Sequence, residues 1–262
     1  MVSYGKTDIG MCRSMNQDCM FFSDKSVGNL PNLYIVADGM GGHQAGDYAS
    51  AHAVSWFVDY VRDCDYVNPI TILKTGITKV NDQLFQMSSE HRELRGMGTT
   101  FVAAVVTGEK LYVANIGDSR LYVIGDEVKQ ITLDHSLVEE LIRTGQLERR
   151  KVRFHPEKNI ITRALGTARE AVPDFFEVIL QEKDKILLCS DGLTNMVEDD
   201  EIGLIINRSI YRALIENHFA YVMWSVPIVP LLIVLIYVLW AVILSVLSPA
   251  ARIRRMAITK TI

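Results

Sequence analysis

The chain has 262 residues, enough for one large domain whose core needs no disulfide bonds, and its four cysteines form no CxxC pair typical of zinc or redox sites. The formal net charge of −4 is uneven, because residues 1–202 hold 21 Lys and Arg against 30 Asp and Glu, whereas residues 203–262 hold 6 against 1. An acidic domain lacks the Lys/Arg footprint that nucleic-acid binding requires, so nucleic acid is excluded as a partner.

The first half of the chain predicts one buried strand and then two amphipathic helices. Residues 32–37 form a short apolar run that stops at Asp38-Gly39, so we expect a strand that enters a tight loop. Apolar residues then recur at helical spacing over 45–61 and again over 72–87. The sequence therefore predicts adjacent helices directly after the loop.

The second half predicts several short antiparallel strands. Runs of β-branched and aromatic residues are separated by Gly-Glu-Lys, Gly-Asp-Ser and Gly-Asp-Glu turns, which predicts a meander. A short helix with Ser136 as its N-cap comes next, and a later hairpin ends at Ser190-Asp191-Gly192. Strands and helices come in blocks, which favours an α+β sandwich with helices covering antiparallel sheets. The expected strands are 99–107, 111–115, 120–124, 128–131, 175–180 and 185–189.

The C-terminal part predicts a membrane anchor. Residues 220–247 contain no charged side chain, and 28 residues of helix would be roughly 42 Å long, against a hydrocarbon core of about 30 Å. We expect one transmembrane helix there, a juxtamembrane linker over 209–219 and a basic tail over 248–262. The basic tail favours a cytoplasmic C-terminus by the positive-inside rule. However, the first twenty residues contain no secretion signal, so we expect a single-pass protein with its large domain, 1–208, in the cytoplasm.

Three aspartates stand beside glycine at the ends of predicted strands. They are Asp38 in Asp-Gly-Met-Gly-Gly-His, Asp118 in Gly-Asp-Ser, and Asp191 in Ser-Asp-Gly. Any one alone is more often a turn, but three together indicate a site. Carboxylate and carbonyl oxygens without clustered His or Cys favour Mg²⁺ or Mn²⁺. Two such ions bridged by Asp38 would activate a water for attack at phosphorus.

A phosphate site also needs a cation and an acid. Arg13, just before Asn16-Gln17-Asp18, is a candidate because a guanidinium can bind two phosphate oxygens. His43 is a candidate general acid for the leaving oxygen, with a structural role in its glycine-rich loop as the alternative. No cysteine is followed six residues later by arginine, which excludes thiol-based phosphatase chemistry.

Seven motifs follow one another between residue 1 and about residue 200. They are TDIGMCRSMNQD, VADGMGGHQAG, GMGTTFVAAVV, VANIGDSRLYVI, TLDHS, ITRALG and LCSDGLTNMV. In this order they resemble the metal-dependent protein phosphatases of the PPM family, type 2C, in their bacterial form. The resemblance implies a four-layer αββα sandwich of two antiparallel sheets between pairs of helices.

The resemblance also implies a role for each matching residue. Asp38 would bridge two ions, with the Gly39 carbonyl and Asp191 completing part of their shells and Asp18 binding through water. Asp118 would hold a third, weaker ion beside a mobile flap at about 145–155. Arg13 would take the phosphate of phosphorylated serine or threonine in proteins that a Ser/Thr kinase has modified.

The chain departs from the family after residue 201. Family members end with a Gly-Gly-x-Asp-Asn segment that enters a final strand, and residues 202–262 contain none. One aspartate ligand and one core strand would be missing, which leaves an unpaired sheet edge and predicts weak or absent hydrolysis. Two explanations stay open: a membrane-tethered phosphatase with an altered site, or a tail from a rearranged reading frame. A phosphatase-like module that binds phosphoproteins without turnover is the alternative function.

Overall fold

The computed structural model describes residues 1–11, 13–41, 45–199 and 201–206. The chain divides into two units, Met1–Ile205 and Ile206–Ile262, and the sheets and helices described below belong to the first. The predicted linker, transmembrane helix and basic tail lie outside the described residues. Within the described part, none of the helices combines the length and the apolar character that crossing a membrane requires.

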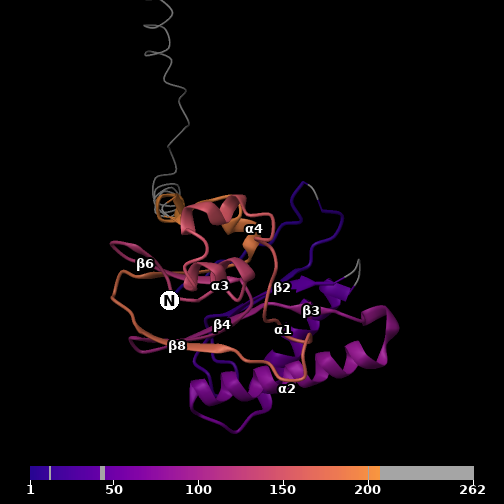
Figure 1. The fold of residues 1–262 in the computed structure, drawn as a ribbon. Helices are drawn as coiled ribbons and strands as arrows, with labels where there is room; N and C mark the ends of the chain where they lie inside the picture. Colours follow the sequence, from indigo (N-terminus) through magenta and orange to yellow (C-terminus); the bar gives the residue numbers. More distant parts are fainter. Residues whose placement is uncertain (12, 42–44, 200, 207–262) are drawn as a thin grey trace, which may run out of the picture. The chain divides into compact units, whose positions relative to one another are not determined.

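Two antiparallel sheets form the centre of this unit (Figure 1). The larger sheet has the order β1-β2-β4-β5-β8, and the short strand β3 pairs with the end of β2. The smaller sheet has the order β7-β6-β9. The strands are β1 (Asp18–Ser23), β2 (Leu33–Met40), β3 (Gly98–Thr99), β4 (Phe101–Thr107), β5 (Lys110–Ile116), β6 (Arg120–Ile124), β7 (Val128–Gln130), β8 (Asp174–Ile179) and β9 (Lys185–Cys189).

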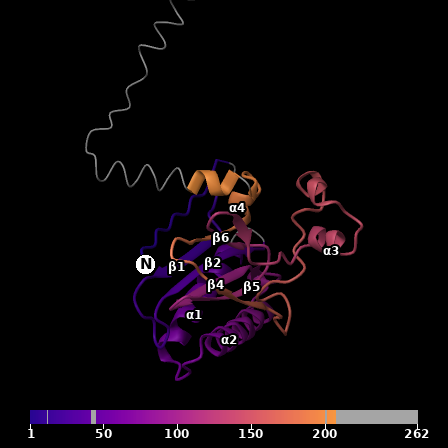
Figure 2. The same cartoon turned by 90° about the vertical axis from the view of Figure 1, so that its left-hand side faces the viewer.

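Two long helices cover one face of the larger sheet. These are α1 (Ala45–Asp63) and α2 (Pro69–Glu90), which lie side by side beneath the strands (Figure 2). Asn68 caps α2 by accepting a hydrogen bond from the Thr71 amide, and Pro69 occupies the first turn, where no amide hydrogen is needed. Both helices confirm the prediction from the spacing of apolar residues.

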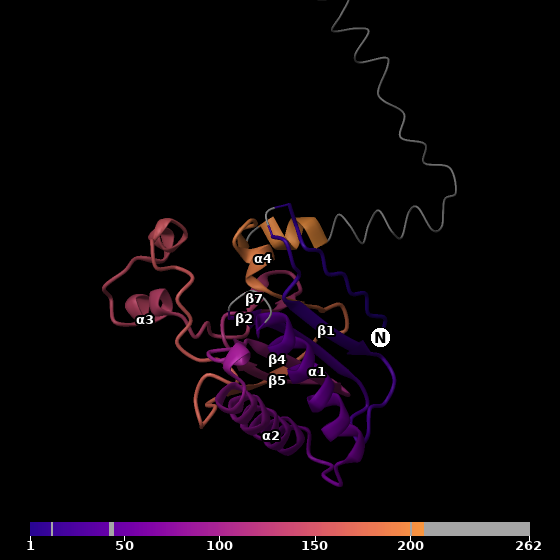
Figure 3. The same ribbon diagram turned by 90° about the vertical axis from the view of Figure 1, so that its right-hand side faces the viewer.

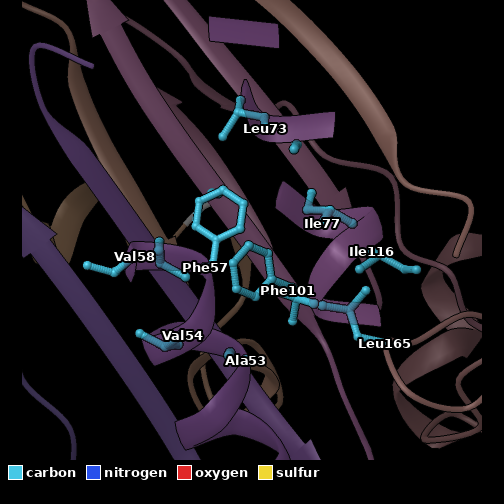
Figure 4. Packing of buried hydrophobic residues seen from close by; sticks show 14 of the residues in the cluster. Ala53, Val54, Phe57, Val58, Leu73, Ile77, Phe101, Ile116 and Leu165 are labelled. Carbon is cyan, nitrogen blue, oxygen red and sulfur yellow. The ribbon is translucent and has the colours of Figure 1, made fainter. Parts of the chain in front are cut away.

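The layer between these helices and the sheet is apolar. Phe57 of α1 and Phe101 of β4 are fully buried, with ring centroids 5.0 Å apart and planes tilted by 56° (Figure 4). Gly76 of α2 lies against Phe57 so closely that a Cβ atom there would be 2.6 Å from the ring. Tight packing of this kind is a main source of stability in a domain of this size.

The second apolar layer lies between the two sheets. Along β2, Leu33, Ile35 and Ala37 face the helices, whereas the alternate residues Tyr34 and Val36 face the smaller sheet. Alternation of this kind follows from the two-residue period of a strand. The layer is completed by residues of the other strands, including Val102, Ala104, Leu111, Val113, Leu121, Val123, Ile186 and Leu188.

Two sequence-based pairings are wrong. The predicted meander over 99–131 is interrupted, because β5 pairs with β4 and β8 while β6 pairs with β7 and β9. The predicted hairpin of β8 and β9 is also absent from the described residues, since β8 joins the larger sheet and β9 the smaller one. Alternating apolar residues indicate a strand with one buried face, but they do not say which sheet it joins.

The outer face of the smaller sheet is covered by the end of the described chain. Ile202, in a helical segment at 201–205, is buried, and a Cβ atom at Gly203 would be 2.4 Å from Val128. The hydroxyl of Tyr122 in β6 donates to Asp199 at 2.8 Å. The α+β fold with two antiparallel sheets flanked by helices is therefore confirmed. Among the described residues, the end strands β1 and β8 of the larger sheet and β7 and β9 of the smaller sheet each pair with one neighbour only.

The segment between β7 and β8 forms a projection. It begins with α3 (Leu137–Arg143) and continues through the 3-10 helix η2 (Arg149–Phe154), and Figure 3 shows it extending to one side of α4 (Asp191–Thr194). Ser136 caps α3 by accepting from the Glu139 amide at 3.3 Å, as the sequence predicted. The predicted flap over 145–155 lies in this projection.

Candidate metal centre

Asp38 lies in β2, on the face that looks toward the smaller sheet. The sequence predicted that the strand ends before Asp38, but β2 continues through Met40, because Gly39 and Met40 pair with Thr99 and Gly98 of β3. Because side chains alternate between the two faces of a strand, Asp38 lies on the same face of β2 as Tyr34 and Val36. Its carboxylate stands at the end of the layer between the sheets.

Asp18 is the direct cross-strand partner of Asp38. The antiparallel register of β1 and β2 places the two residues opposite each other. Side chains in such a pair have Cβ atoms about 4.5–5.5 Å apart, and like charges there destabilise the sheet. The hydroxyl of Ser190 donates to the Asp18 carboxylate at 2.8 Å and so holds it from the side of β9. Two carboxylates held opposite each other favour a cation between them.

Asp118 and Asp191 come from the ends of two further strands. Asp118 lies in the turn between β5 and β6, where the chain crosses from one sheet to the other, and it is 9% exposed. Asp191 is the first residue of α4, directly after β9 and Ser190. Its carboxylate accepts from the Asn195 side chain at 2.9 Å. Strands of both sheets therefore deliver carboxylates to one end of the sandwich.

The electrostatics show that the four aspartates interact. Burial, together with the charges of Asp18, Asp191 and Asp118 in that order, raises the pKa of Asp38 to about 8. Burial, followed by the charges of Asp191 and Asp134, raises the pKa of Asp118 to about 7. Such shifts arise where burial and neighbouring carboxylates outweigh any positive charge nearby, as they outweigh Arg120 beside Asp118. The site therefore favours protons or cations.

The oxygen-rich donor set fits Mg²⁺ or Mn²⁺. Among the described residues, no three His, Cys, Asp or Glu side chains converge tightly enough to form a cage around one ion. These ions, however, usually keep several waters and need only one or two carboxylates each. Asp18 and Asp38 lie opposite each other, and the charges of Asp118 and Asp191 are near enough to raise the pKa of Asp38. These carboxylates meet that requirement.

Gly39 is required by its surroundings. A Cβ atom there would be 1.9 Å from the carbonyl oxygen of Gly46, in the first turn of α1. The Gly39 amide donates to the carbonyl of Gln17 at 3.0 Å, which ties β2 to the segment before Asp18. This close approach fixes the backbone whose carbonyl the resemblance assigns to a metal.

The sequence did not identify the hydroxyls that hold Asp38. The Asp38 amide donates to Thr100 Oγ1 at 2.8 Å, and the Thr99 hydroxyl donates to the Asp38 carbonyl at 3.0 Å. Thr100 Oγ1 also shares a hydrogen bond of 2.8 Å with Ser119 Oγ, next to Asp118. Two buried hydroxyls thus connect the Asp38 amide to the residue that follows Asp118. No periodicity marks Thr100 for this role, whereas the Asn195 contact has the i, i+4 spacing of a helical pair.

For the other predicted site residues, no hydrogen bond or ion pair to the four aspartates occurs among the described residues. Arg13 is exposed, in the segment that leads into β1. His43 lies outside the described residues. In the predicted flap, Arg153 donates to Glu198 at 2.7 Å and to the Met196 carbonyl at 3.2 Å, which connects η2 to the turn after α4.

Comparison with known proteins points to one family. The sequence profile of the family Protein phosphatase 2C matches residues 3–217. The serine/threonine phosphatase stp of Listeria monocytogenes is 42% identical over 218 residues, which cover 81% of this chain and 84% of that protein. Protein phosphatase PhpP of Streptococcus pneumoniae is 42% identical over 211 residues, 78% of this chain and 83% of PhpP.

Solved structures agree with the sequence relatives. The crystal structure of serine/threonine phosphatase Stp1 from Staphylococcus aureus superposes with a TM-score of 0.71 and 36% identity, covering 77% of this chain and 80% of that one. The catalytic domain of the serine threonine protein phosphatase PstP in complex with 2 manganese ions gives a TM-score of 0.66 and 31% identity, over 75% of this chain and 80% of that domain.

Proposed function

Because the chain belongs to the Protein phosphatase 2C family, we propose that it removes phosphate from phosphoserine and phosphothreonine in proteins, with Mn²⁺ or Mg²⁺ as cofactor. The observation that carries this proposal is the convergence of Asp18, Asp118 and Asp191, from three separate strand ends, on Asp38. The relatives are named as phosphatases, which favours the enzyme over a module that binds phosphoproteins without turnover.

The carboxylates and one backbone carbonyl of the site would bind the metal ions. Asp38, the Gly39 carbonyl, Asp18 and Asp191 would hold two ions, and Asp118 a third. Bound ions would supply a water of lowered pKa and offset the charge that develops at phosphorus.

The neighbouring polar side chains orient these ligands. Thr100 fixes the backbone of Asp38, and Ser190 and Asn195 each donate to one carboxylate, on Asp18 and Asp191. Ligand carboxylates held in this way lose little freedom when an ion binds.

Arg13 and His43 would act on the substrate. A guanidinium can bind two phosphate oxygens, and Arg13 is exposed to solvent, where a phosphoprotein can reach it. His43 would protonate the leaving oxygen of serine or threonine. Replacing Arg13 with Lys should raise KM for phosphopeptide more than it lowers kcat, if Arg13 acts in binding.

The decisive experiment measures Mn²⁺-dependent turnover of p-nitrophenyl phosphate and of a phosphothreonine peptide by the full chain. We expect hydrolysis that is weaker than that of a relative with the Gly-Gly-x-Asp-Asn segment and that Asp38→Ala reduces further, by roughly 10³-fold, which corresponds to about 4 kcal/mol of activation free energy. The exposed carboxylate variant Asp82→Ala on α2 should retain full activity. Mn²⁺ binding in calorimetry without any turnover would instead support the binding module.

We also propose that residues 220–247 anchor the phosphatase domain to the cytoplasmic face of a membrane. The uncharged length of this run supports the proposal. In intact cells, a protease should reach an epitope added after Ile262 but not the large domain. Cleavage of the large domain would show the opposite orientation. Recovery of the whole chain in the soluble fraction would refute the membrane anchor. The substrates would then be cytoplasmic proteins phosphorylated by a Ser/Thr kinase.

A further inference from the structure

Gly117 and His135 are joined by two hydrogen bonds that run in opposite directions. The His135 amide donates to the Gly117 carbonyl at 2.9 Å, and the Gly117 amide donates to Nδ1 of the His135 ring at 3.1 Å. The His135 side chain is buried, with 3% of its surface exposed. One residue therefore satisfies both backbone polar groups of the glycine that precedes Asp118.

Gly117 is also constrained by Thr100. Its φ of +108° lies in a region that favours glycine, and a Cβ atom would be 2.6 Å from the Cβ of Thr100. Gly117 is thus held by close contacts with both Thr100 and His135. Because Asp118 is the next residue, the orientation of Gly117 decides where the Asp118 carboxylate lies.

The hydrogen bonds assign the His135 tautomer. Nδ1 accepts from Gly117, so it carries the lone pair, and Nε2 carries the hydrogen, which it donates to Asp174 at 3.0 Å. Arg163 Nη1 lies 3.4 Å from both Nε2 and the Asp174 carboxylate. Since Nε2 carries the hydrogen, Arg163 pairs with Asp174 and not with the ring.

We propose that His135, with its tautomer fixed by Asp174, is a positioning residue that holds the Gly117–Asp118 turn and keeps the Asp118 carboxylate beside Asp38 and Asp191. The role is distinct from catalysis, because His135 acts through the Gly117 backbone. It rests on the proposed function only in taking Asp118 as a metal ligand. Residues that orient metal ligands typically change metal affinity by about 10–100-fold when they are replaced.

Two substitutions separate the two bonds of the ring. In His135→Asn, the side-chain oxygen can stand near the position of Nδ1 and accept from Gly117, but the amide does not reach Asp174. In His135→Gln, the longer side chain can reach Asp174 but leaves the Gly117 amide without its acceptor. The exposed His91 at the end of α2 provides the control variant His91→Gln.

The test is calorimetric titration of the full chain with Mn²⁺, with circular dichroism to verify folding. The ion that Asp118→Asn removes defines the Asp118-dependent site. We expect His135→Gln to weaken that site by about 10–100-fold, His135→Asn to weaken it less, and His91→Gln to leave it unchanged. Equal weakening by Asn and Gln, or no weakening by Gln, would overturn the proposal.

A second measurement needs neither metal nor activity. In ¹⁵N NMR of histidine-labelled, metal-free protein, His135 should carry its hydrogen on Nε2, and Asp174→Asn should let the ring populate both tautomers. A hydrogen on Nδ1 in the wild type would overturn the proposal. A calorimetric Mn²⁺ titration that Asp118→Asn leaves unchanged would also overturn it. The latter result would leave the function at Asp38 intact, because that function is tested separately by turnover of Asp38→Ala.

Discussion

The two layers that β2 joins use burial in opposite ways. Toward the helices, β2 presents Leu33, Ile35 and Ala37 to a layer of apolar side chains. Toward the smaller sheet, it presents Tyr34 and Val36 and then Asp38, so the second layer is apolar in its middle and ends in carboxylates. The same strand thus contributes to a layer that stabilises the fold and to a site that costs stability.

The difference explains why the fold tolerates a charged cluster. The helix–sheet layer buries large side chains such as Phe57 and Phe101. A buried aromatic ring of this kind typically contributes about 3–5 kcal/mol to the free energy of unfolding. The aspartates repel one another, as the raised pKa values of Asp38 and Asp118 show. A cation that binds them would turn this local cost into a binding energy that only the folded chain can provide.

The largest effect should come from the helix–sheet layer. Phe57→Ala removes a fully buried ring that packs on Phe101 and Gly76, so the free energy of unfolding should fall by about 3–5 kcal/mol. Urea unfolding without metal measures it. Phe22, which is 44% exposed in β1, is the matched control, and its alanine variant should lose far less. If Phe57→Ala left stability nearly unchanged, the division between the two layers would be wrong.

A smaller effect should arise at the junction of the layers. Thr100→Val keeps the shape of the side chain but leaves the buried Asp38 amide without its acceptor, so the free energy of unfolding should fall by about 1–3 kcal/mol. Mn²⁺ affinity should fall as well, because Thr100 also contacts Ser119. Thr100→Ser, which retains the hydroxyl, should recover most of both. Equal losses in Ser and Val would show that the methyl group matters and the hydroxyl does not.

The carboxylate end should behave in the opposite sense to Phe57. Asp38→Asn replaces a carboxyl whose ionised form is disfavoured by burial and by Asp18, Asp118 and Asp191, so the metal-free protein should gain about 1–2 kcal/mol near neutral pH while losing activity. Thermal unfolding with and without Mn²⁺ tests this, and Mn²⁺ should stabilise the variant less than the wild type. Asp82→Asn, on the exposed side of α2, should change neither value. A destabilised Asp38→Asn protein would contradict the idea that the site costs stability.

Much of the fold could be predicted from local patterns. The helical spacing over 45–61 and 72–87 predicted α1 and α2, and the end of each apolar run located most strands within a few residues. Strand partners could not be predicted, because β6 and β8 have the alternation that either sheet would accept. Asp38 was placed in a loop because Asp-Gly usually forms a turn, whereas the short strand β3 extends β2 past it.

The sequence predicted the aspartates of the candidate site but not the hydroxyl side chains that hold them. The recurrence of Asp beside Gly predicted that Asp38, Asp118 and Asp191 meet, and the charge of Asp191 contributes to the raised pKa of both Asp38 and Asp118. Thr100, Ser119 and Ser190 act through contacts between residues far apart in the chain, and hydroxyl side chains of this kind are common at any strand end. Only the folded register shows that they hold the aspartates.

The most gradual expected effect is a pH dependence of the stability of the metal-free protein, which accumulates over several pH units. The pKa of Asp38 rises from 3.8 to about 8 on folding, and that of Asp118 to about 7, so the folded state binds more protons than the unfolded state between about pH 4 and 8. The stability that these two groups contribute is fully present below pH 3.8, the pKa of the unfolded state. It is lost as pH rises through the folded-state pKa values of about 7 and about 8. Each group would contribute a slope of at most about 1.4 kcal/mol per pH unit.

Unfolding by urea at about pH 5.5, 6.5, 7.5 and 8.5 measures this slope. The wild-type protein without metal should lose stability toward the alkaline end, and Asp38→Asn should flatten the curve, because Asn does not titrate. With excess Mn²⁺ the slope should reverse, since the ion binds ionised carboxylates and competes with protons for them. A metal-free curve that rises with pH over this range would mean that the aspartates are compensated by another positive charge, and the contrast between the two layers of β2 would disappear.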